Sequence, residues 1–93
     1  MKTHLRLYVT GETIRADRAI ASLRRICDEY VDGAYEIEVI DVKKDPQHAE
    51  DAKIIATPTL VRVLPEPARR IIGDLSDAER VATGLDFRRE VAL

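Results

Sequence analysis

The chain has 93 residues, of which 45% are apolar and 34% are charged. This composition is typical of one globular domain with a single core and excludes intrinsic disorder. Fifteen basic and seventeen acidic residues give a formal charge of −2, which excludes an overall field that would attract nucleic acid or a membrane surface. We therefore expect one domain over residues 1–93, with any electrostatic recognition confined to a local patch.

Two further features of the composition concern location. No apolar run approaches the ~20 residues that cross a bilayer, so we predict no membrane association. The single cysteine, Cys27, cannot form a disulfide within the chain, which favours a cytoplasmic location.

The first half of the chain predicts a strand, a helix and a second strand. Leu5 to Val9 alternates apolar and polar residues, as a half-buried strand does. Thr13 is a good helix N-cap, and apolar residues then recur at helical spacing from Ala16 to Tyr30. Residues 35–42 predict the second strand, whose nearly all-apolar end we expect to be covered on both faces. The long connection favours a right-handed βαβ unit with parallel strands.

The middle of the chain predicts a short helix and two paired strands. Asp45 is a good N-cap, and Pro46 fits the first helical turn. The apolar stripe that follows is weak and consists of Ala49, Ala52, Ile55 and Ala56. Residues 59–64 and 69–72 then predict strands, and the short proline-containing turn between them favours antiparallel pairing.

A third helix is predicted near the C-terminal end. Ser76 and Glu79 have the spacing of a capping box, and Val81 and Leu85 fall on the inner side of the helix that follows. Gly84 either lies inside this helix, at a cost of about 1 kcal/mol relative to alanine, or ends it.

The stretch Ala56-Thr57-Pro58-Thr59 gives this order of elements a more specific interpretation. X-Pro bonds are the peptide bonds for which the cis form costs only about 0.5–1 kcal/mol. A Thr-Pro at the mouth of a strand, within the order βαβαββα, resembles the cis-proline corner of the thioredoxin-like fold. We therefore predict an α/β fold with a mixed sheet.

Chemistry at such a corner would require a reactive thiol, and none is placed for it. A redox protein of this fold carries a cysteine at the start of the first helix, where the helix dipole lowers the thiol pKa. Residues 10–15 contain no cysteine, and Cys27 lies on the apolar stripe, where a buried, inert thiol is expected.

No other residues have the spacing of a catalytic, metal or cofactor site. His4 and His48 have no partners at metal-ligand spacing, so we interpret both as surface residues. The glycines form no phosphate-binding loop. We therefore predict no catalytic residue, metal or cofactor.

What remains is a set of basic residues that could form one arginine-rich patch facing an acidic partner: Arg18, Lys53, Arg62, Arg69 and Arg70. The alternative interpretation is a solvated face, or charges that protect a sheet edge. Aromatic residues are too few for a platform that stacks single-stranded nucleic acid.

Several strings of residues, in order and at matching spacing, resemble the KaiB family. The resemblance covers roughly residues 5 to 86. Its most specific strings are Ala56-Thr57-Pro58-Thr59-Leu60, Arg69-Arg70-Ile71-Ile72-Gly73-Asp74-Leu75-Ser76-Asp77 and Gly84-Leu85-Asp86.

The resemblance implies a non-enzymatic adaptor of the KaiABC clock system. Such a protein binds the N-terminal ATPase ring of a KaiC-type hexamer, and the bound ring then sequesters KaiA or displaces a KaiB-like sensor histidine kinase. The five basic residues match positions implicated in partner binding, with Arg62 in place of a lysine. A clock or a simpler timer both fit this role.

The resemblance also implies a fold switch. The KaiC-binding state has the thioredoxin-like order βαβαββα, whereas the ground state, a dimer or tetramer, has the order βαββααβ. Gly84 and Asp86 match the determinants of the switch, and the isomer state of Pro58 is a further candidate. Two other functions stay open: a thioredoxin-like redox or thiol-binding protein without a CxxC motif, and a scaffold that oligomerises through a sheet edge.

Overall fold

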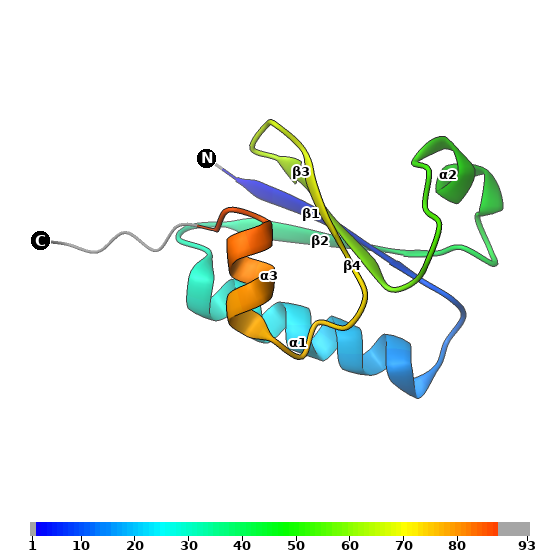
Figure 1. Cartoon of the computed structure of the whole chain (residues 1–93), viewed down its shortest axis with the longest axis horizontal. Helices are drawn as coiled ribbons and strands as arrows, with labels where there is room; N and C mark the ends of the chain where they lie inside the picture. Colours follow the sequence, from blue (N-terminus) through cyan, green and yellow to red (C-terminus); the bar gives the residue numbers. More distant parts are fainter. Residues whose placement is uncertain (1, 88–93) are drawn as a thin grey trace, which may run out of the picture.

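The computed structural model describes residues 2–87, which form four strands and three helices in the predicted order βαβαββα (Figure 1). The elements are β1 (Thr3–Val9), α1 (Ile14–Tyr30), β2 (Tyr35–Asp41), α2 (Pro46–Asp51), β3 (Thr59–Leu64), β4 (Arg69–Ile72) and α3 (Ala78–Gly84).

The strands form one mixed sheet in the order β2-β1-β3-β4. β1 pairs in parallel with β2, as predicted, and antiparallel with β3, which pairs antiparallel with β4. The expectation that the end of β2 is covered on both faces is wrong, because β3 takes the place beside β1 and leaves β2 at an edge. Val39 of β2 is consequently 43% exposed, and Ile40 is the only buried residue of this strand.

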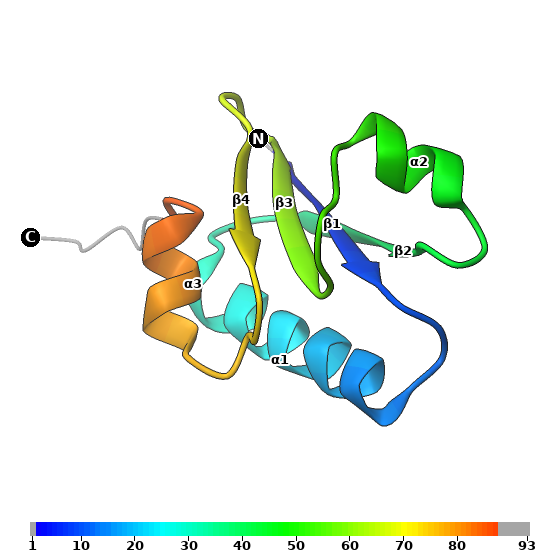
Figure 2. The same ribbon diagram turned by 45° about the vertical axis from the view of Figure 1, so that its right-hand side comes forward.

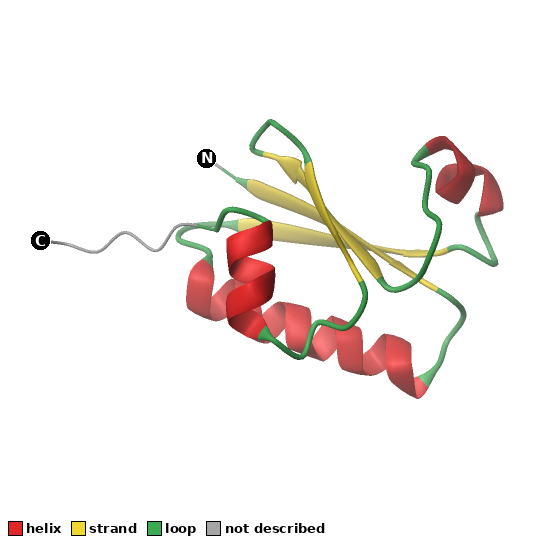
Figure 3. Cartoon of the chain, viewed as in Figure 1, coloured by secondary structure: helices red, strands yellow, loops and turns green. Residues whose placement is uncertain are grey.

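Helices α1 and α3 lie on the same face of the sheet, as Figures 2 and 3 show. The main core fills the space between these helices and the strands. Its residues are Leu5, Leu7 and Val9 of β1, Leu60 of β3, Ile71 of β4, Ala16, Ala19, Leu23, Ile26 and Cys27 of α1, and Leu75, Val81 and Leu85 at α3.

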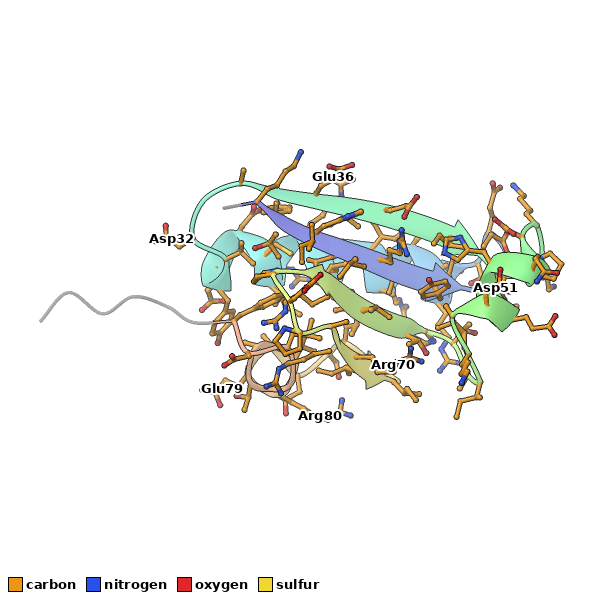
Figure 4. All side chains as sticks on the ribbon, turned by 90° about the horizontal axis from the view of Figure 1, so that it is seen from above. Asp32, Glu36, Asp51, Arg70, Glu79 and Arg80 are labelled. Atoms are coloured by element: carbon orange, nitrogen blue, oxygen red, sulfur yellow. The ribbon has the colours of Figure 1, made fainter. Side chains whose placement is uncertain are left out.

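Within residues 2–87, the opposite face carries α2 alone, at one end (Figure 4). Tyr8 packs under this helix, with its hydroxyl 3.2 Å from His48 Nε2 and the two rings edge to face at 5.5 Å. His48 is therefore half-buried, and its interpretation as a surface residue is wrong. The predicted stripe of α2 is wrong beyond Ala49, since the helix ends at Asp51 and Ile55 is 84% exposed.

Two of the three predicted helix caps are confirmed. The Thr13 hydroxyl accepts a hydrogen bond from the amide of Ala16, and the Asp45 carboxylate accepts one from the amide of His48, each at 3.1 Å. The capping box on Ser76 is wrong, because Asp77 one residue later caps α3 by accepting from the amide of Arg80. Aspartate and serine are equally good caps, so the tertiary position of the loop decides between them.

No helix within residues 2–87 is long and apolar enough to cross a membrane.

Candidate functional site

Thr57 and Pro58 form the corner before β3. The Thr57-Pro58 bond is cis, and Pro58 is buried. A cavity of about 270 Å³ lies between this corner and the start of α1. The hydroxyls of Thr10 and Thr57 approach each other to 2.5 Å there, a contact between residues 47 positions apart that sequence reasoning missed. The corner cavity therefore carries hydroxyl groups, and no cysteine lines it.

The only cysteine lies elsewhere. Cys27 is fully buried in the core, as predicted, and does not line the corner cavity. Burial, reinforced by the charge of Asp28, raises the pKa of the Cys27 thiol to about 12. A buried thiol that stays protonated is not a nucleophile at neutral pH, because the thiolate is the reactive form.

Arg62 does not lie on a surface patch. It is only 5% exposed, because it follows Leu60 on the face of β3 that α1 and α3 cover. Its guanidinium donates to the carbonyl of Leu85 at 2.6 Å and to that of Pro67 at 2.8 Å. Cations are favourable at a helix C-terminus, so Arg62 holds the end of α3 against the β3–β4 turn.

Arg70 makes a similar contact on the other face of the sheet. Its side chain is exposed on β4 (Figure 4), and it donates to the carbonyls of Ala52 at 3.0 Å and Lys53 at 3.2 Å. These carbonyls lie at the end of α2, so Arg70 ties α2 to the sheet. The backbone of Lys53 is thereby brought to Arg70, whereas its own side chain is exposed.

The C-terminal ends of α2 and α3 have the same pattern of backbone hydrogen bonds. The amides of Lys53 and Ile54 donate back to Glu50 and Ala49, and those of Asp86 and Phe87 donate back to Thr83 and Ala82. This is the Schellman motif, which usually has glycine at the left-handed position. Here Lys53 (φ 56°) and Asp86 (φ 55°) occupy that position, at a cost of about 1–2 kcal/mol each.

Each of these two helix ends is contacted by its own arginine, and the carbonyls that accept the hydrogen bonds are at equivalent positions. Arg70 donates to the C-cap residue of α2 and to the left-handed residue after it, Ala52 and Lys53. Arg62 donates in the same way to Leu85 and, at 3.5 Å, to Asp86. We call these two contacts the arginine clamps. The sequence offers one sign of these contacts, which is a residue other than glycine directly after the C-cap of each helix. This sign does not show which arginine makes the contact.

The remaining predicted residues lie apart from one another. Arg69 is exposed at the outer strand β4, opposite Arg62 in the register of the sheet. Arg18 is exposed on α1 and lines a cavity together with Pro58. The five basic residues thus form no single patch, and two of them hold helix ends.

Gly84 is the last residue of α3 and Leu85 is the C-cap. Of the two alternatives for Gly84, it therefore lies inside the helix. A Cβ at Gly84 would lie 2.5 Å from Cδ1 of Ile71, so glycine allows α3 to approach β4 closely.

Fold and site together define a thioredoxin-like domain whose corner carries hydroxyls and no cysteine and whose two later helices are held by arginine clamps. The solved structures that share the fold include two from different organisms. The N-terminal domain of Synechococcus elongatus SasA has a TM-score of 0.76 at 22% identity, covering 99% of this chain and 90% of that chain. Mitochondrial thioredoxin 3 of Saccharomyces cerevisiae has a TM-score of 0.68 at 18% identity, and the match covers 90% of this chain and 76% of the thioredoxin.

The chain belongs to the KaiB family, whose domain matches residues 6–87. It is 55% identical over 86 residues to the circadian clock oscillator protein KaiB of Microcystis aeruginosa. These residues make up 92% of this chain and 83% of that protein. The chain is therefore a KaiB-like clock adaptor, and the predicted family and thioredoxin-like fold are both confirmed.

Proposed function

We propose that this protein is a non-enzymatic adaptor that binds the N-terminal ATPase ring of a KaiC-type hexamer and regulates its phosphorylation cycle. The observation that carries the proposal is the combination of a KaiB domain over residues 6–87 with the thioredoxin-like order βαβαββα. This is the order that the sequence resemblance assigns to the KaiC-binding state. KaiA or a KaiB-like sensor histidine kinase is then the further partner of the bound ring.

Arg18, Lys53, Arg69 and Arg70 are the exposed residues available for this contact. Arg62 acts indirectly, because its guanidinium is buried and bonded to the carbonyls of Leu85 and Pro67. Guanidinium groups suit an acidic protein surface, since they pair with carboxylates through two parallel hydrogen bonds.

The adaptor reaches its binding state through a fold switch, with a homo-oligomeric ground state of order βαββααβ. The second half of the chain supports this proposal, because α2 has six residues, β4 has four, and both later helices end in a strained left-handed residue. One sequence can adopt two packings only if their free energies differ by a few kcal/mol, and short, strained elements keep this difference small. Gly84, Asp86 and Pro58 lie in this half, which is where a switch would act.

A second proposal of ours concerns location. The protein acts in the cytoplasm, where its single cysteine stays a thiol. The redox alternative gains no support from residues 2–87, because Cys27 is buried and remote from the corner cavity.

Co-migration with a KaiC-type ATPase on size exclusion, in the presence of ATP, tests the proposed function. The wild type should co-elute after a day of incubation. Arg69→Glu should weaken the complex, because it reverses an exposed charge. Arg80→Glu on α3 is the matched control and should leave the complex intact. No complex with the wild type, or equal loss in both variants, contradicts the proposal.

Secondary chemical shifts over residues 45–87 test the fold switch. A helix over 46–51 and strands over 59–64 and 69–72 are expected in the complex. Helices across 61–72 in the bound protein would contradict it.

A further inference from the structure

A groove runs along one flank of α1, between this helix and the loop that joins β4 to α3. It consists of two adjoining cavities of about 440 Å³ and 200 Å³. Ser22 of α1 and Leu75 of the loop line both cavities, so the two lie side by side. We call the two cavities together the α1 groove.

Three arginines line the α1 groove. Arg15 and Arg18 belong to the larger cavity and Arg25 to the smaller one. All three are exposed, and no carboxylate within residues 2–87 lies within ion-pair distance of any of them. Two acidic residues also line the groove: Asp74, which accepts a hydrogen bond from the amide of Ser76, and Glu29 in the smaller cavity.

The opposite flank of α1 has a different character. Arg24 lies there and is exposed, near Tyr35 at the start of β2. Tyr35 also donates to the carboxylate of Asp28 at 2.6 Å. Arg15, Arg18 and Arg25 therefore lie on the groove side of α1, whereas Arg24 lines neither cavity.

The floor of the α1 groove is apolar. Ala19 is 6% exposed and Leu75 is 3% exposed, and Pro58 is buried beside them. Ile14 closes one end and is 73% exposed, which is unusual for a large aliphatic side chain. An occupant of the groove would thus meet guanidinium groups at the rim and aliphatic carbon below.

We propose that the α1 groove docks an acidic, partly apolar peptide segment of the partner protein. Its carboxylates pair with Arg15, Arg18 and Arg25, and its aliphatic side chains cover Ile14 and the floor. The arginines span about 15 Å of helix at ~1.5 Å per residue, which an extended segment of about five residues matches at ~3.3 Å per residue. The inference rests on the proposed adaptor function and assigns the chemistry of its contact.

The first test uses a probe that does not depend on the partner. The capped peptide Glu-Leu-Glu-Asp-Leu-Glu is titrated into the full chain labelled with ¹⁵N. Amide shifts are expected at residues 14–25 and 74–76. Arg18→Glu should weaken binding about tenfold, because it replaces an attraction by a repulsion, whereas Arg24→Glu should change it less than about twofold.

Other results of this titration overturn the proposal. They are the absence of binding at millimolar peptide, and equal weakening by Arg18→Glu and Arg24→Glu. Inorganic phosphate is the control for simple anion binding. If phosphate produces the same shifts at Ile14 and Leu75 as the peptide does, the apolar floor plays no part and the assigned occupant is wrong.

The second test separates this inference from the proposed function. A KaiC-type ATPase is mixed with wild type, Arg15→Glu/Arg18→Glu and Arg24→Glu, and only the double variant should lose the complex. If the wild type forms no complex while the peptide still maps to the groove, the proposed function fails and the groove stands. If the double variant binds as well as wild type, the groove is overturned and the adaptor function stands.

Discussion

Gly84 of α3 and Ile71 of β4 are in such close contact that a Cβ at residue 84 would lie 2.5 Å from Cδ1 and 2.9 Å from Cγ1 of the isoleucine. Alanine in a helix is worth about 1 kcal/mol relative to glycine. Overpacking a core costs about 1–3 kcal/mol. Gly84→Ala should therefore not stabilise this fold, and we expect its free energy of unfolding in urea to stay at or below the wild-type value.

The same substitution should behave differently beside a smaller neighbour. Ile71→Val removes Cδ1, the atom of the shorter contact. The contact with Cγ1 at 2.9 Å remains, so Gly84→Ala should lower the free energy of unfolding less in that background than in the wild type. A double-mutant cycle in urea measures this coupling. Additive effects of the two substitutions would show that Ile71 and Gly84 are independent.

The clamp between Arg62 and Leu85 predicts that lysine is a poor replacement. A lysine has one ammonium group and cannot reproduce the fork that bonds both Leu85 and Pro67. Arg62→Lys should cost about 1–3 kcal/mol of unfolding free energy, because a buried carbonyl loses its donor. Arg69→Lys, at the exposed position opposite in the sheet, is the control and should change stability by less than about 0.5 kcal/mol. Equal effects of the two substitutions would contradict the clamp.

The left-handed backbone of Lys53 predicts that glycine stabilises the end of α2. Lys53→Gly relieves the steric cost of a side chain at φ 56° and should raise the unfolding free energy by about 0.5–1 kcal/mol relative to Lys53→Ala. The alanine variant is the right reference, because it removes the charge and leaves the backbone cost. Thermal unfolding of both variants measures the difference, and a more stable alanine variant would refute the prediction.

The buried thiol predicts very slow labelling of Cys27 in the folded protein. Its pKa is raised from 9.0 to about 12, so its thiolate fraction at pH 8 is about a thousandfold below that of the unfolded chain. Because the folded pKa is the higher one, this group contributes stability that is complete below pH 9 and is lost as the pH rises through about 12. Iodoacetamide labelling with and without urea measures the contrast. Equal rates in both conditions would mean that Cys27 is accessible.

The carboxylate of Asp41 predicts a loss of stability in acid. It accepts hydrogen bonds from the amides of Gly11 and Lys43, each at 2.9 Å, and these bonds hold its pKa below the ordinary value of 3.8. A lowered folded pKa contributes stability that is complete above the unfolded pKa and is lost as the pH falls through the folded one. Urea midpoints from pH 3 to 6 should therefore show wild type losing its advantage over Asp41→Asn only below about pH 4. A constant difference across this range would refute the assignment.

The local elements could be predicted because their signals lie close together in the sequence. Thr13 and Asp45 cap helices within three residues of themselves, and the alternation from Leu5 to Val9 needs no distant partner. The Thr57-Pro58 corner placed β3, and the short turn after Leu64 required antiparallel pairing. Element order and strand direction followed from these signals.

The contacts of the candidate site could not be predicted, because each joins residues far apart in the chain. Arginine is usually a surface residue, so the sequence gives no reason to place Arg62 inside. Only its register opposite Leu5 shows that it is buried beneath the end of α3. The same limit applies to β2, whose apolar end was expected to be central. Its edge position depends on where β3 inserts, which no local pattern in β2 records.

The central position of β1 has a consequence for the synthesis of the chain. β1 leaves the ribosome before β3, which supplies the pairing along one of its edges. Thr59 follows Val9 by 50 residues, counted as 59 minus 9, and translation at roughly 5–20 residues per second takes about 2.5–10 s to cover them. Throughout that interval β1 presents unpaired backbone groups to any neighbouring strand. The pace of ribosomes over codons 10–58 therefore sets how long each new molecule is exposed to mispairing.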